Sequence, residues 1–284
     1  MYAKGKLLII GGAEDMGDKI PSASKKNQGE LQRYEILREL FNASRNKKIE
    51  VITSGSRYQE EVRQRYEKAF RDLGYLNSGF IQIEDKMEAR EKIYLDRIEQ
   101  ADGIFFTGGD QFRLATILGG TPLIDRIRER YVGDKTFIVA GTSAGAMVMS
   151  SIMITEGGEE EALMESDLKT SSGLGFLQNC IIDTHFIKRG RFARLAHAII
   201  INPDQLGVGL GEDTALIIKN GSEAECRGSG MVVIIDGKSI RQTNISTVKE
   251  DDAVYVENLK VHLLVKNCRF SIKTRKLYNP TLKD

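Results

Sequence analysis

The sequence has few cysteines and histidines, almost no net charge and no long apolar run. Its three cysteines, Cys180, Cys226 and Cys268, are widely spaced and odd in number, so they provide neither a metal-binding spacing nor a disulfide framework. This cysteine usage favours a reducing cytoplasm as the location. The formal net charge is +1, from 41 basic and 40 acidic residues, which argues against nucleic acid or an anionic membrane surface as the partner.

Membrane-crossing and export signals are missing as well. No stretch approaches the roughly 20 apolar residues that a helix needs to cross a bilayer. Residues 1–15 contain a short apolar run that ends in glycines and acids, which indicates a first β-strand and not a signal peptide. The 284 residues are 41% hydrophobic, which is enough for a full core. We therefore expect a single domain over residues 1–284.

Short apolar strands alternate with amphipathic helices in the first half of the chain. Strands are expected at 6–10, 49–53, 81–83, 103–107 and 136–140, and helices at 30–43, 58–73, 87–100 and 112–131, the last of them broken at residues 119–122. This alternation predicts βαβ units, and so an α/β fold with a mostly parallel sheet and helices on both faces. A strand at 180–183 and a basic amphipathic helix at 188–201 follow. From about residue 206 short strands dominate, which predicts a β-rich C-terminal extension of the same sheet.

The strongest functional signal is a G-x-S-x-G element at residues 141–145. An apolar strand leads into it and a helix-compatible run leaves it, which is the context of a nucleophile elbow. Ser143 is then a candidate nucleophile, and the amide of Ala144 is free to stabilise an oxyanion. A Gly-Gly-Asp turn follows another strand at the same sheet edge, so the amides of Gly109 and Asp110 are candidates for the second half of the oxyanion hole. A phosphate-binding turn and a plain turn are the simpler alternatives for these two elements.

A serine nucleophile needs a neighbouring base, which is usually histidine. His185 directly follows the 180–183 strand and would reach the same edge, whereas His197 and His262 are better explained as structural residues. The acid that orients the imidazole is either Asp183 or a member of the acidic loop, and the residues themselves do not choose between them. The loop offers Glu156, Glu159, Glu160 and Glu161.

Four cations are crowded into the seven residues 188–194, shortly after this histidine: Lys188, Arg189, Arg191 and Arg194. They form either a solvated helix face, a nucleic-acid patch, or a clamp for substrate carboxylates. The balanced overall charge disfavours the patch.

Taken together, these motifs resemble the cyanophycinase family, which belongs to the serine peptidases that also include peptidase E. The resemblance covers about residues 5–220 and rests on the segments 11–14, 107–111, 141–146, 183–186, 189–194, 207–210 and 212–215. It implies a parallel-sheet α/β fold related to class I glutamine amidotransferases. It also implies hydrolysis of cyanophycin, a polymer with a poly-aspartate backbone and an arginine on each side chain, to β-aspartyl-arginine dipeptides.

The resemblance further implies roles for individual residues. Ser143 would be the nucleophile, His185 the base and Glu161, eighteen residues after the serine, the third member. The substrate pocket would use Gln111, Asp183, Thr184, Arg189, Arg191 and Arg194. Thr184 stands where cyanophycinases typically carry glutamine, so the pocket is expected to differ in detail. No metal or cofactor is required, and a homodimer is expected because family members are often dimers.

Two other functions stay open at this point. One is an aspartyl dipeptidase similar to peptidase E, which is shorter and lacks the extra C-terminal β region. The other is a non-catalytic amidotransferase-like binding module, in which Ser143 would not react with an acylating probe.

Overall fold

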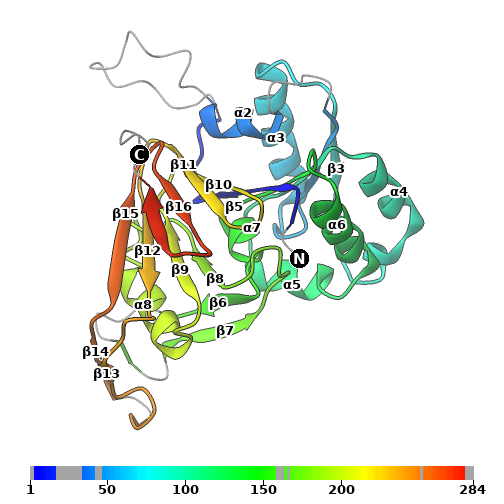
Figure 1. Ribbon diagram of the computed structural model, residues 1–284. Coiled ribbons are helices and arrows are strands. Elements are labelled where there is room, and N and C mark those ends of the chain that lie inside the picture. Colours follow the sequence, from blue (N-terminus) through cyan, green and yellow to red (C-terminus); the bar gives the residue numbers. More distant parts are fainter. Residues whose placement is uncertain are drawn as a thin grey trace.

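A nine-stranded main sheet forms the centre of the structure (Figure 1). The computed structural model describes residues 3–16, 34–41, 47–157, 163–164, 167–249 and 252–278. The strand order in the main sheet is β17-β16-β11-β10-β1-β5-β4-β2-β3. Its parallel part consists of β1 (Lys6–Ile10), β5 (Ile138–Thr142), β4 (Gly103–Phe106), β2 (Ile49–Ile52) and β3 (Ser78–Ile81). The expected α/β fold with a mainly parallel sheet is therefore confirmed.

Four strands from the C-terminal part extend the main sheet in antiparallel fashion next to β1. They are β10 (Thr214–Lys219), β11 (Glu223–Gly228), β16 (Arg269–Ser271) and β17 (Lys276–Tyr278). The other C-terminal strands do not join this sheet. Three of them form a second sheet together with β8 (Cys180–Asp183). They are β9 (Leu206–Leu210), β12 (Val232–Asp236) and β15 (Lys260–Leu264). The predicted extension of one sheet is thus correct only for part of these strands.

The remaining described strands form two small antiparallel ribbons of two strands each. They are β6 (Ile152–Glu156) with β7 (Lys169–Ser172), and β13 (Gln242–Thr243) with β14 (Val256–Glu257).

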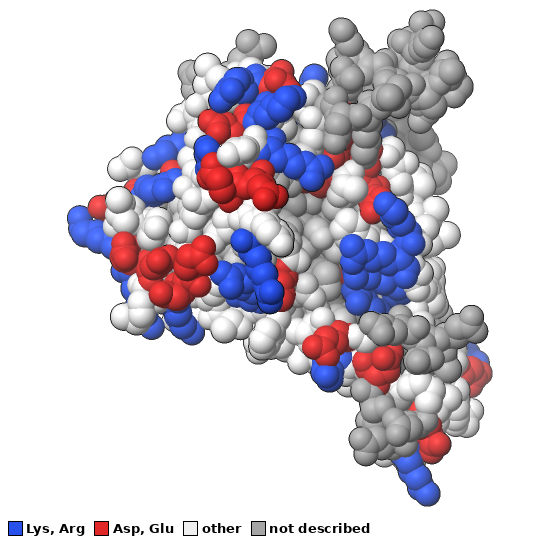
Figure 2. All heavy atoms as spheres, turned by 180° about the vertical axis from the view of Figure 1, so that it is seen from behind, with Lys and Arg blue, Asp and Glu red and all other residues white. Residues whose placement is uncertain are grey.

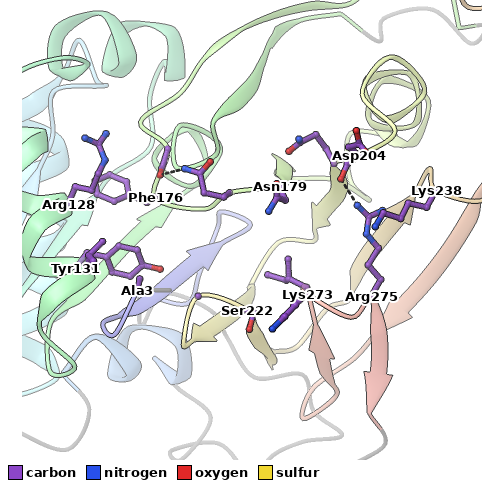
Figure 3. Close-up of a pocket in the computed structure, with 16 residues that line it drawn as sticks. Ala3, Arg128, Tyr131, Phe176, Asn179, Asp204, Ser222, Lys238, Lys273 and Arg275 are labelled. Carbon is purple, nitrogen blue, oxygen red and sulfur yellow. Dashed lines mark hydrogen bonds between the residues drawn. The ribbon is translucent and has the colours of Figure 1, made fainter. Parts of the chain in front are cut away.

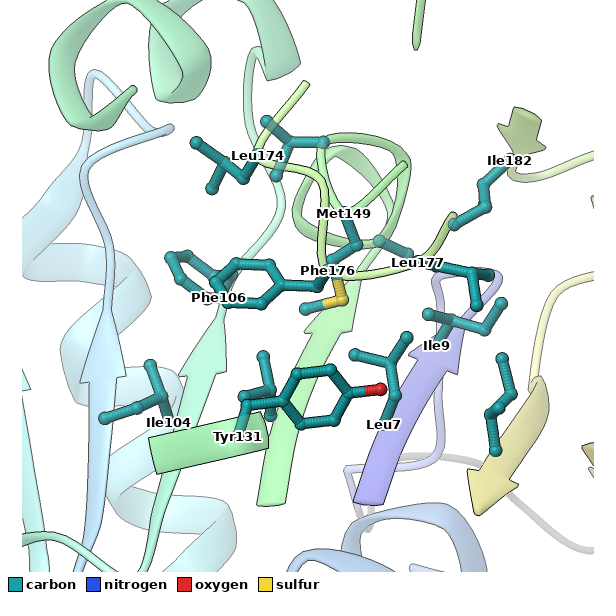
Figure 4. Packing of buried hydrophobic residues seen from close by; sticks show 14 of the residues in the cluster. Leu7, Ile9, Ile104, Phe106, Tyr131, Met149, Leu174, Phe176, Leu177 and Ile182 are labelled. Atoms are coloured by element: carbon teal, nitrogen blue, oxygen red, sulfur yellow. The ribbon is translucent and has the colours of Figure 1, made fainter. Parts of the chain in front are cut away.

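The central parallel strands β1, β5, β4 and β2 are buried on both faces, as expected for parallel strands that are mostly apolar. In β1, Leu8 and Ile10 pack toward α2 (Glu35–Phe41) and α3 (Gln59–Asp72). Leu7 and Ile9 face the opposite core, where Figure 4 shows Phe106, Tyr131, Met149 and Phe176 packed together. The second sheet packs against this same side through β8, β9 and β12.

The remaining helices follow the expected order with small differences. They are η2 (Glu88–Arg90), α4 (Lys92–Gln100), α5 (Gln111–Leu118), α6 (Pro122–Gly133), α7 (Ala144–Met147) and α8 (Phe192–Ile201). The break between α5 and α6 is confirmed: Gly120 has φ +67° and Pro122 begins α6. Helix α8 begins four residues later than predicted, after Gly190 at φ +61°, and covers the outer face of the second sheet. Among the described helices, none combines the length and apolar character needed to traverse a bilayer.

Candidate active site

The candidate site lies where the carboxyl ends of the two sheets meet. The amide of His185, just after β8, donates a 2.9 Å hydrogen bond to the carbonyl of Gly11, just after β1. The amide of Asp213, after β9, donates to the carbonyl of Gly12 at 2.9 Å. The loop after β1 thus ties the ends of β8 and β9 to the main sheet, and the carboxyl edge is where ligands collect in such sheets.

Ser143 occupies a sharp turn between β5 and α7. Its backbone has φ 53° and ψ −120°, a conformation that non-glycine residues rarely adopt. Its amide donates to the carbonyl of Ile10 at 3.0 Å, which fixes the turn against β1. A Cβ at Gly145 would lie 2.2 Å from the carbonyl oxygen of Phe106, so only glycine fits there. The spacing of glycine around this serine therefore reflects close backbone packing.

Ser143, His185 and Glu212 form a hydrogen-bonded array. The Oγ of Ser143 lies 3.0 Å from Nε2 of His185, and Nδ1 of His185 lies 2.8 Å from Oε1 of Glu212. A carboxylate can only accept, so Nδ1 carries the proton and Nε2 is left to accept the proton of the serine hydroxyl. The turn thus directs the side chain of Ser143 toward His185, which follows β8.

The carboxylate of Glu212 is stabilised in its charged form. The hydrogen bond from His185 and a second one from Lys188, at 3.1 Å, lower its pKa below the ordinary value of 4.5. The side chain of Glu212 is 26% exposed and that of His185 is 14% exposed, so the array is reachable from solvent yet largely enclosed.

Sequence reasoning did not assign Glu212 to this array, although a signal for it was present. Glu212 follows the 206–210 strand after a single glycine, the same kind of position that led to His185. Glu161, which the family resemblance favoured as the third member, lies outside the described residues. Asp183, the other candidate, has different partners.

Two of the three expected oxyanion donors are available. In the described part of the chain, the amides of Gly109 and Ala144 have no hydrogen-bond partner. Gly108 lies beside the serine, because a Cβ there would be 3.4 Å from the Cβ of Ser143. The third expectation is not met: the amide of Asp110 donates to the carbonyl of Gly55 at 2.9 Å. The Asp110 carboxylate instead caps α5, accepting from the amides of residues 112 and 113.

Asp183 forms a buried ion pair with two arginines of the expected substrate pocket. Its carboxylate is fully buried, and Oδ2 accepts from Nε of Arg194 at 2.6 Å. Arg194 is only 8% exposed. Arg191 donates to Oδ1 of Asp183 at 3.2 Å and to the carbonyl of Thr184 at 2.7 Å. Burial lowers the pKa of Arg191 to about 10, against the opposing effect of Asp183. These three side chains hold α8 against β8, and their expected role in binding substrate stays a prediction.

The remaining residues of the expected substrate pocket, Gln111, Thr184 and Arg189, differ in burial and in hydrogen bonding. Gln111 uses its Nε2 to donate to the carbonyl of Ile154 at 3.0 Å. Thr184 is 1% exposed, with a hydroxyl that has no partner in the described part. Arg189 is exposed in the turn before α8 and keeps its guanidinium at the surface.

A pocket of about 260 Å³ opens beside Ser143. Its lining includes residues that the sequence analysis missed: Met16, Ser56, Arg65 and Tyr66. Ser56 follows strand β2 and could have been found by the strand-end argument, whereas the α3 residues carry no such signal.

Figure 2 shows the face of the molecule opposite to that of Figure 1, where basic and acidic side chains lie in small neighbouring groups. This mixture agrees with the net charge near zero.

A serine, a histidine and a carboxylate in this order of hydrogen bonds, beside two unoccupied amides, define a serine hydrolase site on an α/β fold. Comparison with known proteins agrees with that class. Residues 20–225 match peptidase family S51, and the chain belongs to this family of serine-type peptidases.

Two sequence relatives and one solved structure show how similar the chain is to known proteins. The chain is 34% identical over 276 residues to the cyanophycinase of Geminocystis herdmanii, with 96% of each chain covered. It is 31% identical over 217 residues to peptidase E of Haemophilus influenzae, covering 71% of this chain and 91% of the relative. The crystal structure of a peptidase from an acI-B1 Actinobacterium superposes with a TM-score of 0.63 at 22% identity, over 95% of this chain and 98% of the other, which shows a shared fold.

Proposed function

We propose that this chain is a serine exopeptidase that hydrolyses the poly-aspartate backbone of cyanophycin to β-aspartyl-arginine dipeptides. The observation that carries the proposal is the near full-length match to cyanophycinases, 96% of both chains, combined with the array of Ser143, His185 and Glu212. The match to peptidase E covers 71% of this chain, which favours cyanophycin over an Asp-X dipeptide as the substrate.

The array supports an acyl-enzyme mechanism at a nucleophile elbow. His185 takes the proton from the Ser143 hydroxyl as Oγ attacks a backbone carbonyl carbon. The amides of Gly109 and Ala144 stabilise the oxyanion that forms. His185 then gives its proton to the leaving amine, and the acyl group stays on Oγ as an ester. Water, deprotonated by His185, resolves this ester and restores the free serine.

Glu212 takes the role of third member in this proposal. Its carboxylate holds the proton of His185 on Nδ1 and stabilises the imidazolium that forms during each proton transfer. Asp183 is left out of this role, because its oxygens are occupied by Arg191 and Arg194.

Two cations are candidates to bind substrate carboxylates. Arg65 lines the pocket beside Ser143, and Arg189 is exposed in the turn that follows His185. A guanidinium can bind a carboxylate through two parallel hydrogen bonds, which suits the chain-terminal aspartate of a poly-aspartate substrate.

The test is a product assay with the purified protein. Wild type and Ser143→Ala are incubated with cyanophycin and, separately, with Asp-X dipeptides, and the products are separated by chromatography. We expect β-aspartyl-arginine from wild type and none from the variant. Cleavage of Asp-X dipeptides alone would favour the peptidase E-like function. No cleavage of either, together with no labelling of Ser143 by a serine-directed acylating probe, would favour a binding module.

A cytoplasmic location and a homodimer belong to the same proposal. The three cysteines are free thiols, two of them buried, which suits a reducing compartment. The dimer rests on the family resemblance, and sedimentation of the purified chain tests it.

A further inference from the structure

A second, larger cavity lies at the end of the sheets opposite to Ser143. Its volume is about 820 Å³, and Figure 3 shows the residues that line it. Ala3, Asn179 and Gln205 belong to the lining and precede strands β1, β8 and β9. The candidate active site follows the carboxyl ends of the same sheets, so the two sites are separate.

Two buried polar atoms of the lining have no hydrogen-bond partner in the described part of the chain. They are Oη of Tyr131 and Oε1 of Gln205. Tyr131 is 2% exposed, its ring packs edge-on against Phe176 with centroids 6.1 Å apart, and its hydroxyl points toward the cavity (Figure 3). Burial raises the pKa of Tyr131 to about 12, so the hydroxyl keeps its proton and can donate. A buried donor or acceptor without a hydrogen-bond partner is unfavourable unless a ligand or water satisfies it.

The charges around the cavity favour an anion. Four cations belong to the lining, namely Arg128, Lys238, Lys273 and Arg275, against the single acid Asp204. Arg275 is paired with Asp236, and Arg128 with Asp125 at 2.9 Å. Lys238 is exposed and forms no ion pair with any described residue, so its charge is available to a ligand. The apolar part of the lining includes Phe176 and Ile272.

We infer that this cavity binds a small organic anion that carries a carboxylate and an N–H donor, as an amino acid derivative or short peptide does. Lys238 attracts the carboxylate at the mouth. The Tyr131 hydroxyl donates to a ligand oxygen, and Oε1 of Gln205 accepts from the ligand N–H. Carbon atoms of the ligand pack against Phe176 and Ile272.

The test is calorimetric titration of the full chain with N-acetyl-L-aspartate, which has carboxylates and an amide N–H. Tyr131→Phe removes only the unpartnered hydroxyl, and Lys238→Met removes only the unpaired charge. We expect each to weaken binding about tenfold, the loss associated with one hydrogen bond or charge contact. Lys86→Met, at an exposed lysine outside the cavity, is the matched control and keeps wild-type affinity. The melting temperature of Lys238→Met confirms that this variant folds.

Three outcomes overturn the inference. The first is no heat of binding at millimolar ligand. The second is equal affinity in wild type, Tyr131→Phe and Lys238→Met, with loss of binding on Arg65→Gln, which would place the ligand in the pocket beside Ser143. The third is equal affinity for succinate or inorganic phosphate, which lack an N–H donor matching Gln205. Weaker binding of succinate and phosphate than of N-acetyl-L-aspartate supports the assignment.

Discussion

Nδ1 of His185 and Oε1 of Glu212 lie 2.8 Å apart, although 27 residues separate them along the chain. The contact exists because β8 and β9 are parallel neighbours, with Cys180 opposite Leu206 and Asp183 opposite Gly209. Both residues therefore leave the same edge of the second sheet. This register determines which acid orients the imidazole.

Replacing Glu212 with glutamine should reduce turnover strongly. The amide removes the negative charge and no longer favours the proton on Nδ1, so kcat should fall by on the order of 10³–10⁴-fold with little change in KM. Steady-state kinetics on cyanophycin measure this. Lys188→Met is the matched control, because it removes a partner of Glu212 and leaves the bond to His185 intact. Unchanged kcat in Glu212→Gln would exclude Glu212 from the mechanism.

The lowered pKa of Glu212 also predicts a pH dependence of stability. The hydrogen bonds from His185 and Lys188 keep the folded-state pKa below the ordinary value of 4.5. The unfolded chain then binds more protons, so the contribution of Glu212 to stability is present above pH 4.5 and is lost as the pH falls through the folded-state pKa. Urea unfolding of wild type and Glu212→Gln at a series of pH values should show their difference narrowing in acid. A difference that stays constant down to the acid limit would contradict this linkage.

The buried pair of Asp183 and Arg194 should contribute to stability and not mainly to substrate affinity. Arg194→Met leaves the buried carboxylate with Arg191 and the amide of Thr184 as its described partners, so the free energy of unfolding should fall by about 3–5 kcal/mol. Arg189→Met, on an exposed side chain, should change it by less than about 0.5 kcal/mol while raising KM. Chemical denaturation and kinetics on the two variants measure the contrast. A stable Arg194→Met protein with raised KM would contradict this and support a role for Arg194 in substrate binding.

Glu14 should act as a positioning residue for the serine turn. It is 3% exposed and accepts from Oγ1 of Thr142 at 2.7 Å and from Oη of Tyr66 at 2.6 Å. Thr142 directly precedes Ser143, so Thr142→Val should displace the turn and lower kcat by about 10- to 100-fold, with KM less affected. Thr142→Ser keeps the hydroxyl and should restore most of kcat. Equal kcat in wild type and Thr142→Val would show that this contact does not position the nucleophile.

Local patterns were sufficient to predict the central strands and the positions of Ser143 and His185. Apolar β-branched runs followed by glycine fix where these strands end, and in a parallel sheet the strand ends share one edge. The break between α5 and α6 was also readable, because glycine followed by proline ends a helix locally.

Contacts between distant segments were not readable in the same way. Which strands join the second sheet depends on how β9, β12 and β15 pair, and the period of side chains along a strand does not reveal its neighbour. The position of Glu212 after a strand is visible in the sequence, but the pairing that brings this strand end next to that of His185 is not. The family resemblance places the arginines after His185 in the substrate pocket, and a run of cations says nothing about burial. The fold places Asp183 beneath two of them.

The division of the array between two sheets has a consequence for loss of activity. Ser143 follows a strand of the main sheet, while His185 and Glu212 follow strands of the second. The loop after β1 links them through backbone hydrogen bonds to residues 185 and 213. If the two sheets separate slightly, every strand and helix can persist while the proton path from serine to carboxylate is broken. Hydrolysis is therefore a sensitive reporter of how the sheets are docked, and mild denaturant should abolish it before the far-ultraviolet circular dichroism changes.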